Sequence, residues 1–275
     1  MLIAQISDIH CGAAGAAARL QETVSALAAL DPAPDLLLLT GDLAEYGQTR
    51  DYAELHKAFA AFPIQILPIP GNHDRRDAFR AAFANYGFAF GPHDFCQYAK
   101  DFYALRIIGL DTVREDSDEP ELCATRLNWL KRELHGGGAP VLIAMHHPPF
   151  QTGVRWVDAR EPSWSDALGD IVETAQTSIA GIVCGHVHRP IFRNWRSVPV
   201  ISAPAVAPQV KLEFDANQTG RYSGEPPGFL LHRWDGKTLT SYAASASGFA
   251  MSTRFGAMNG DAQAGAANTS GKAGA

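Results

Sequence analysis

Residues 2–10 read LIAQISDIH, a short apolar run followed by an aspartate and a histidine two positions apart. An apolar run of this length that ends in polar residues is typical of a buried β-strand. Asp8 and His10 would then lie just past the end of that strand. On an extended segment, side chains two positions apart point the same way. The segment therefore predicts a strand that delivers two metal-binding side chains to the edge of a sheet.

The same pattern occurs four more times in the first 190 residues, each time with Asp, Asn or His after an apolar run. The further blocks are Gly41-Asp42, Gly71-Asn72-His73-Asp74, His146-His147 and Gly185-His186-Val187-His188. In stacked α/β folds, the loops that follow the strands form the active crevice. The five blocks together predict a site for two metal ions at one rim of the sheets, and such a site points to hydrolysis.

Hydrolysis at neutral pH needs a strong nucleophile and neutralisation of the negative charge on the substrate. Two metal ions about 3.5–4 Å apart can supply both, because a hydroxide that bridges them attacks while both cations hold the substrate. Such a pair needs a bridging carboxylate. Asp42 is the candidate, since it stands alone in its block after a glycine. The nitrogen and oxygen donors, without a thiolate, suit Mn, Fe, Zn or Co, and the sequence does not choose among these metals.

The order of the five blocks resembles the signature of the calcineurin-like metallophosphoesterases, over residues 1–190. The resemblance implies an α/β fold of four layers, an αββα sandwich in which two mixed β-sheets pack face to face between outer helices. It places the binuclear metal site at the strand ends. It also implies which residues hold each ion: Asp8, His10, Asp42 and His188 for one metal, and Asp42, Asn72, His146 and His186 for the other.

The resemblance assigns His73 to the reaction and not to a metal, as a phosphate contact or as the acid that protonates the leaving oxygen. Asp74 is then a candidate to orient His73 through its other ring nitrogen. His147 is expected to face away from the metals or to lie behind the ligands. Ligation by His147 in place of His146 is the alternative. The expected catalytic residues are Asp42, Asn72 and His73.

Further stretches, such as Leu110-Asp111-Thr112 and Gly185 to Pro190, resemble the class III cyclic-nucleotide phosphodiesterases and the related glycerophosphodiesterases. The implied substrates are small phosphodiesters, namely 3',5'-cyclic nucleotides (cAMP or cGMP) or glycerophosphodiesters. Two alternatives stay open. One is a phosphomonoesterase or nucleotidase on the same metals, and the other is a non-catalytic scaffold that binds the metals.

The chain departs from the resemblance between Val113 and Thr125, where acidic residues replace a Gly-rich stretch. This acidic segment, with five acids in residues 115–121, is a candidate lining of the substrate entrance and leaves the exact substrate open. Candidate substrate contacts also include Asn72 and His73. Loop-like stretches supply aromatic and arginine side chains that suit a base or a second phosphate. These further candidates are Arg155, Trp156, Arg193, Asn194 and Tyr222.

The composition of the chain limits the kinds of binding partner and the cellular compartment that we expect. With 275 residues and a net charge of −6, the chain has no basic stripe for a nucleic-acid polymer. No run approaches the 18 apolar residues of a membrane-spanning helix. The first strand begins at Leu2 and leads into a ligand, which argues against a cleaved signal peptide. The four cysteines show no paired spacing, so we expect reduced thiols and a cytoplasmic protein. Homo-oligomer formation stays open.

The pattern of apolar residues predicts one metallophosphoesterase domain over residues 1–255 and a disordered Gly/Ala-rich tail over 256–275. Asp235-Gly236 predicts a hairpin turn between two of the late strands. Helices are expected over residues 19–30, 51–62, 77–86, 125–134 and 165–174. Beyond the strands that precede the five blocks, strands are expected over 102–110, 198–202, 209–214, 228–234 and 238–243.

Overall fold

A computed structural model describes residues 1–60, 62, 64–86, 90, 94–102, 104–135, 138–215 and 219–249. The expected tail, residues 256–275, lies outside the described residues, and so does the expected domain boundary at residue 255.

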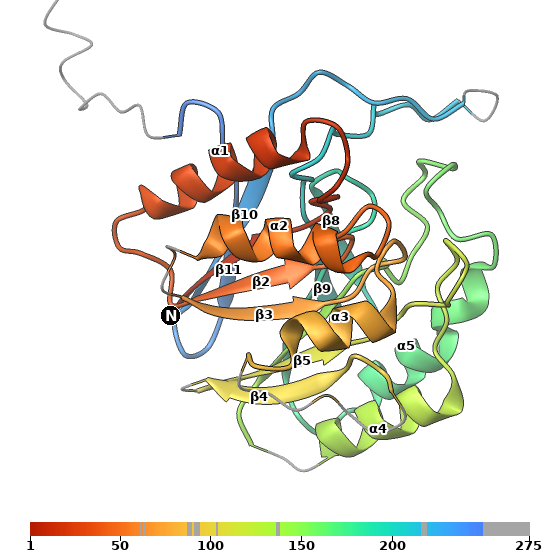
Figure 1. The fold of residues 1–275 in the computed structure, drawn as a ribbon. Coiled ribbons are helices and arrows are strands. Elements are labelled where there is room, and N and C mark those ends of the chain that lie inside the picture. Colours follow the sequence, from red (N-terminus) through yellow and green to blue (C-terminus); the bar gives the residue numbers. More distant parts are fainter. Residues whose placement is uncertain are drawn as a thin grey trace, which may run out of the picture.

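The described strands form a five-stranded and a six-stranded sheet (Figure 1). The first sheet contains β1 (Leu2–Ile6), β2 (Leu36–Thr40), β3 (Gln65–Ile69), β10 (Gly228–Trp234) and β11 (Leu239–Ser245). The second contains β4 (Tyr98–Phe102), β5 (Leu105–Leu110), β6 (Val141–Met145), β7 (Ile179–Cys184), β8 (Ile191–Trp195) and β9 (Val198–Ser202). Their spatial orders are β11-β10-β1-β2-β3 and β4-β5-β6-β7-β9-β8.

Both sheets are mixed, as expected. Strands β1, β2 and β3 are parallel, β10 runs antiparallel to β1, and β11 runs antiparallel to β10 at the edge of the sheet. In the second sheet β5, β6, β7 and β9 are parallel, and β4 and β8 are antiparallel edge strands. Because parallel strands end at the same edge of a sheet, the loops that follow these strands are brought together there.

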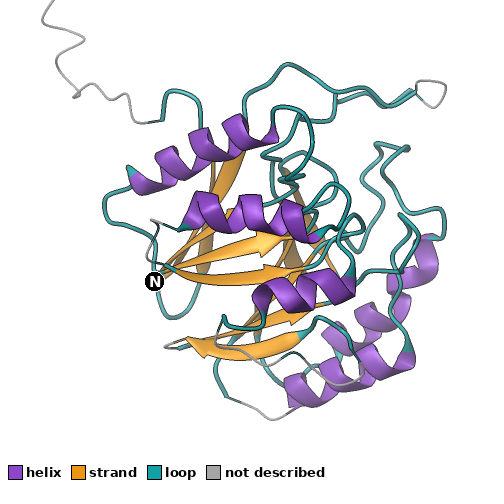
Figure 2. Ribbon diagram, viewed as in Figure 1, coloured by secondary structure: helices purple, strands orange, loops and turns teal. Residues whose placement is uncertain are grey.

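Helices cover the two outer faces, which gives the expected four layers (Figure 2). On the first sheet lie α1 (Ala16–Ala28), α2 (Thr49–Phe59) and α3 (Arg76–Phe83). On the second lie α4 (Ala124–His135) and α5 (Asp166–Glu173), the latter preceded by a short 3₁₀ turn, Pro162–Ser165. Among the described residues, no helix is long and apolar enough to cross a membrane.

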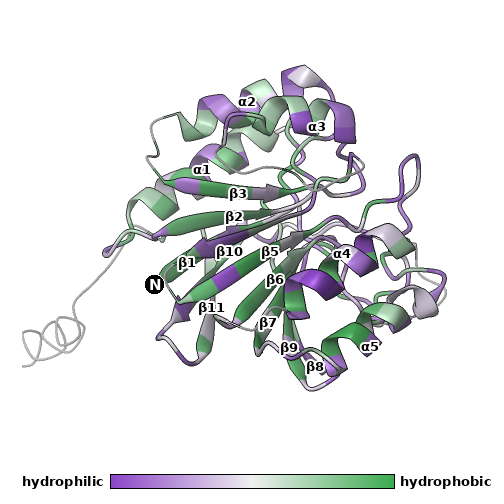
Figure 3. Ribbon diagram, turned by 90° about the horizontal axis from the view of Figure 1, so that it is seen from below, coloured by the Kyte–Doolittle hydropathy of each residue, from purple (hydrophilic) through white to green (hydrophobic). Residues whose placement is uncertain are grey.

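The buried position of the strands explains why they read as continuous apolar runs. On β2, Leu36 and Leu38 pack between the two sheets, while Leu37 and Leu39 pack under the outer helices. All four leucines are fully buried. Figure 3 shows the strands mainly in the hydrophobic colour, whereas the helices carry both colours. A strand that is covered on both faces needs apolar side chains on both faces, so its sequence does not alternate.

Two expected strands need correction, and one observed strand was not expected. Residues 102–110 are not one strand, because the chain reverses between β4 and β5, which pair antiparallel. Residues 209–214 are not a strand. Their backbone forms an isolated bridge from Val210 to Tyr222 and no longer ladder, and Phe214 is 64% exposed. Strand β8 was not expected, because its central side chains are exposed at the edge of the sheet. The hairpin at Asp235-Gly236 is confirmed by the pairing of β10 with β11.

Candidate metal centre and substrate cavity

The five blocks meet at one edge of the two sheets. The first sheet supplies four of the seven expected ligands and the second sheet supplies three. Asp8 and His10 follow β1, Asp42 follows β2, Asn72 follows β3, His146 follows β6, and His186 and His188 follow β7. The sequence therefore located all seven positions at the rim where the structure brings them together.

One group of side chains forms around Asp8. The Nε2 atom of His188 lies 3.4 Å from Oδ1 of Asp8 and 3.3 Å from Nε2 of His10. The same His10 nitrogen lies 3.7 Å from Oδ2 of Asp42. The donor atoms of Asp8, His10 and His188 all lie within 4.8 Å of one another, a spacing that a single metal ion could span.

A second group forms on the other side of Asp42. The Nε2 atom of His146 lies 3.4 Å from Oδ2 of Asp42 and 3.1 Å from Oδ1 of Asn72. The Nδ1 atom of His186 lies 3.0 Å from the same Asn72 oxygen. Oδ2 of Asp42 thus lies between a nitrogen of the first group and a nitrogen of the second. This is the position that a bridging carboxylate requires.

Each of the four histidines has its far ring nitrogen held by an acceptor. The far nitrogen of His10 contacts the Glu45 carboxylate, and those of the others contact backbone carbonyls. These carbonyls belong to Thr40 for His146, Val157 for His186 and Pro208 for His188, at distances of 2.8 to 3.0 Å. A histidine that donates from one nitrogen keeps a lone pair on the other, which is how proteins orient histidine toward a metal. The donor set therefore fits metal binding.

Five of the seven expected ligands have a left-handed backbone, with φ between 50° and 70°. They are Asp8, His10, Asp42, His186 and His188. The expectation that Asp8 and His10 point the same way because their segment is extended is therefore wrong. Left-handed residues redirect the chain after β1, β2 and β7, and the surrounding contacts hold them there. Such conformations are uncommon outside glycine and cluster at functional sites.

The charges around Asp42 favour a cation beside it. Burial alone would raise the pKa of the Asp42 carboxyl, but His146 and His10 hold that pKa well below its usual range. Burial lowers the pKa of His146, yet Asp42 raises it by more, to about 9. The pKa of His186 is lowered to about 4 by burial and by His146. A metal ion would take over the role of the protonated His146 ring, so metal binding would release that proton.

His73 lies beside this centre, but Asp74 does not orient it, which corrects the expectation. The Nδ1 atom of His73 contacts the backbone carbonyl of Glu45 at 3.0 Å, and its backbone N–H donates to Asp42. Asp74 instead accepts hydrogen bonds from the Tyr52 hydroxyl and from backbone N–H groups of Leu43, Ala44 and Gly71. Asp74 therefore joins the loops that carry Asp42 and His73. The sequence analysis missed Glu45, whose only signal is an acid close after Asp42.

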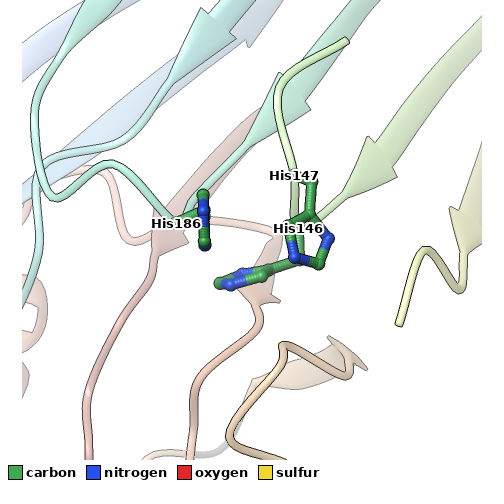
Figure 4. A group of neighbouring side chains, drawn as sticks. All are labelled: His146, His147 and His186. Atoms are coloured by element: carbon green, nitrogen blue, oxygen red, sulfur yellow. The ribbon is translucent and has the colours of Figure 1, made fainter. Parts of the chain in front are cut away.

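A ring nitrogen of His147 lies within 4.8 Å of ring nitrogens of His146 and His186, so these three could also hold one metal ion and the alternative of a His147 ligand stays open. The Nδ1 atom of His147 is 2.8 Å from the Thr112 hydroxyl, and its ring centroid is 4.6 Å from that of His186. Figure 4 shows the rings of His146, His147 and His186 together at the ends of the second sheet. Burial lowers the pKa of His147 well below its usual value, and His186 lowers it further. The ring therefore stays neutral and packs against a neighbouring ligand candidate.

A cavity of about 340 Å³ opens above the centre. The centre contributes its floor through His10, Asp42, Asn72, His73, His186 and His188. Of the expected substrate contacts, Arg155, Trp156 and Tyr222 line the cavity. Asp118 and Glu119, from the acidic segment, also line this cavity.

Arg193 and Asn194 do not line the cavity, which corrects the expectation for both. They lie exposed on the edge strand β8. Arg193 donates to the Gln151 carbonyl and its guanidinium lies over the Phe150 ring. These contacts fix it behind the loop that carries Arg155. Sequence position alone did not show that this stretch is part of a sheet edge.

Comparison with known proteins agrees with this geometry. Residues 1–190 match the family profile described as calcineurin-like phosphoesterase, which is more than half of the chain. The chain belongs to the calcineurin-like phosphoesterase family. Members of this family are metal-dependent, which is consistent with the ligand groups described above.

Two relatives that align along most of both chains indicate the class of reaction. The chain is 31% identical over 239 residues to a 3',5'-cyclic-nucleotide phosphodiesterase of Nostoc sp., covering 83% of this chain and 86% of the relative. It is 28% identical over 264 residues to the glycerophosphodiester phosphodiesterase GpdQ of Enterobacter lignolyticus, covering 91% of this chain and 93% of the relative. This family member is therefore a hydrolase that acts on phosphoric esters.

Solved structures confirm the fold. The purple acid phosphatase PPD1 of yellow lupin (Lupinus luteus) matches with a TM-score of 0.65 at 12% identity, over 90% of this chain and 52% of that chain. GAP50, the anchor in the inner membrane complex of Plasmodium, also matches with a TM-score of 0.65 at 12% identity, over 90% of this chain and 85% of that chain. Since the same fold serves an anchor, the site must carry the assignment of activity.

Proposed function

We propose that the chain is a two-metal phosphodiesterase for small diesters, either 3',5'-cyclic nucleotides or glycerophosphodiesters. The observation that carries the proposal is the position of Asp42, whose Oδ2 atom lies within 3.7 Å of a nitrogen in each ligand group. One carboxylate between two sets of donors is the arrangement that a metal pair requires. A single metal would leave one of these sets without a role.

The proposed ligands follow from the two groups. One metal would be held by Asp8, His10, Asp42 and His188, and the other by Asp42, Asn72, His146 and His186. When bound, such a pair supplies a nucleophile at neutral pH and neutralises the phosphoryl oxygens. The donor set contains imidazole nitrogens and oxygens without a thiolate, so Mn, Fe, Zn and Co all suit it.

His73 is proposed as the proton donor to the leaving oxygen. Its Nδ1–H donates to the carbonyl of Glu45, so Nε2 is the nitrogen that remains for the substrate. With Nδ1 protonated, Nε2 carries a proton only when the ring is charged. His73 therefore contributes as an imidazolium, which also complements the negative phosphate before the proton moves.

The cavity supports a diester more than a monoester. Its volume of about 340 Å³ leaves room for a second ester group above the floor. Trp156 and Tyr222 form part of its wall, with ring centroids 6.2 Å apart. A diester has two ester groups, so one could contact these rings while the other leaves, whereas a monoester has only its leaving group to place there. The relatives named above are phosphodiesterases, which supports the same choice.

A substrate panel tests this function. The purified chain is stripped with a chelator and reloaded with Mn, and metal content is counted by elemental analysis. We expect two metals per chain and faster turnover of cAMP, cGMP, glycerophosphodiesters or bis(nitrophenyl) phosphate than of nitrophenyl phosphate. Faster turnover of the monoester would favour the phosphatase alternative. Two bound metals without turnover of any ester would favour the scaffold.

Asp42→Asn tests the bridge, with Asp77→Asn on the exposed start of α3 as the matched control. The Asp42 variant should bind fewer metals and lose most of its activity, because a neutral amide bridges two cations poorly. The control should behave as the wild type. Two tightly bound metals and normal turnover in the Asp42 variant would remove the bridging assignment.

A further inference from the structure

A polar residue interrupts the apolar layer between the two sheets just below the metal centre. Gln5 lies on β1 at a position where its neighbours on the same face, such as Ile3 and Leu38, belong to the inter-sheet core. Its side chain is fully buried, and so are those of Thr40 and His232. Burying three polar side chains among leucines is costly unless all of them are paired. The presence of these three polar side chains in the core therefore calls for an explanation.

Gln5 is paired at both ends of its amide. Its Nε2 donates to the Thr40 hydroxyl and to the Cys184 carbonyl, each at 2.9 Å. Its Oε1 accepts from Nε2 of His232, also at 2.9 Å. Since Oε1 can only accept, this contact places the His232 proton on Nε2. Nδ1 of His232 then accepts from the Ser241 hydroxyl at 2.7 Å.

Two of these partners, Thr40 and Cys184, are the last residues of strands that lead into the metal centre. Thr40 ends β2, two residues before Asp42, and Cys184 ends β7, two residues before His186. Gln5 itself lies three residues before Asp8. Cys184 belongs to the second sheet, so the bond from Gln5 to its carbonyl joins the two sheets directly.

We propose that Gln5, held in place by His232, is a positioning residue that sets the spacing between the two sheets beneath the metal centre. This inference rests on the proposed two-metal function. Each proposed metal takes ligands from both sheets, so the distance between the sheets sets the shape of both coordination sites. Leucine contacts are non-directional and allow sliding. Hydrogen bonds in a low-dielectric core are directional, and leaving them unmade is costly.

The test separates positioning from simple stabilisation with three variants of the full chain. Gln5→Leu removes the Gln5 brace, that is, the hydrogen bonds of Gln5 with Thr40, Cys184 and His232, and leaves the His232 donor unpaired. Gln5→Leu/His232→Leu removes both partners, which typically recovers part of the stability. Leu36→Ala, at the opposite end of β2 in the same inter-sheet layer, destabilises the core without touching the brace. Melting temperature is measured in chelator, and Mn affinity is measured by titration calorimetry.

We expect both Gln5 variants to bind Mn about ten- to a hundredfold more weakly, the usual effect of losing a group that supports metal ligands. The exchange coupling between two bound Mn ions, read from the electron paramagnetic resonance spectrum, should also change in both. Leu36→Ala should melt at a lower temperature with unchanged Mn affinity and coupling.

Two outcomes would overturn the proposal. In one, Gln5→Leu binds Mn as the wild type does. In the other, the double variant regains Mn affinity together with its stability, which would make the brace only a stabilising contact. If Gln5→Leu does not fold, the double variant alone decides. Failure of the wild type to bind two Mn ions would instead remove the proposed function on which this inference rests.

Discussion

The Glu45 carboxylate lies 2.6 Å from Nδ1 of His10. Burial lowers the pKa of His10, but the hydrogen bond to Glu45 and the nearby Asp42 raise it above its usual value. The contact fixes the ring so that Nε2 of His10 faces His188 and Asp42. A carboxylate behind a metal-binding histidine raises the basicity of the ring and holds its orientation.

We predict that Glu45→Ala weakens Mn binding about tenfold or more, because His10 loses both its orientation and a negative neighbour. Glu45→Gln should be intermediate, since its amide oxygen still accepts from Nδ1. Titration calorimetry with Mn measures both. Glu54→Gln, on the outer helix α2, is the matched control and should bind Mn as the wild type does. Equal Mn affinity in all four proteins would mean that Glu45 plays no part in holding His10.

His73→Ala should keep both metals and lose turnover by about 10²- to 10⁴-fold on diesters with alkyl leaving groups, the usual worth of a placed proton donor. The loss should be small for nitrophenyl diesters, because nitrophenolate leaves without a proton. Comparing the two substrate types in the variant gives the measurement. An equal loss on both would mean that His73 holds phosphate charge and does not donate a proton. Loss of metal would place His73 among the ligands.

We predict that Gly71→Ala displaces the Asp42 side chain through a steric clash. A Cβ atom at Gly71 would lie 2.2 Å from Oδ1 and from the backbone nitrogen of Asp42. The displaced carboxylate could no longer serve both ligand groups, so we expect weaker Mn binding and a fall in kcat of at least about tenfold. Gly224→Ala is the control, since a Cβ there meets nothing within 4 Å. If the two variants have the same kcat, the close approach at Gly71 does not matter for activity.

Trp156→Ala should raise the KM for bis(nitrophenyl) phosphate by roughly two- to tenfold, the worth of one aromatic contact. Its kcat should change little, because the ring lies on the cavity wall and not among the proposed ligands. Asn194→Ala is the control, since Asn194 is exposed on β8 outside the cavity. Steady-state kinetics measure both. An unchanged KM in the Trp156 variant would show that the ester group binds elsewhere.

His232 should make the stability of the fold depend on pH. Burial lowers its pKa from 6.5 to about 4. Between these values the unfolded chain binds a proton that the folded protein does not, so stability falls as the pH falls from 6.5 toward 4. The effect is absent above pH 6.5 and complete below pH 4. From pH 7 to pH 5 the loss should be about 2 kcal/mol.

Denaturant unfolding in chelator, at pH 7 and pH 5, tests the effect of His232. His232→Gln cannot titrate, so its free energy of unfolding should fall by about 2 kcal/mol less than that of the wild type over this window. Chelator removes the separate effect of metal release at low pH. Parallel pH dependence in the two proteins would show that His232 is not the titrating group.

Much of the fold was predictable because a buried strand can be recognised from a short apolar run in the local sequence. The runs Leu36–Leu39 and Val141–Met145 are apolar without alternation, since both faces of each strand are covered. The outer helices were also predictable from their apolar spacing. Residues 209–214 and strand β8 were not. The first segment alternates apolar and polar residues, with Val210, Leu212 and Phe214, but forms only an isolated bridge, and the second is an edge strand whose central side chains are exposed. Their structure depends on distant partners and not on local periodicity.

The sequence by itself determined which residues reach the rim, because each ligand block directly follows a buried strand and parallel strands end together. Only the tertiary structure decided how those residues are held. Glu45 behind His10, Gln5 between the sheets and Arg193 behind a loop all depend on contacts between segments far apart in the chain. Side-chain orientation follows from packing across both sheets, and no local pattern records it.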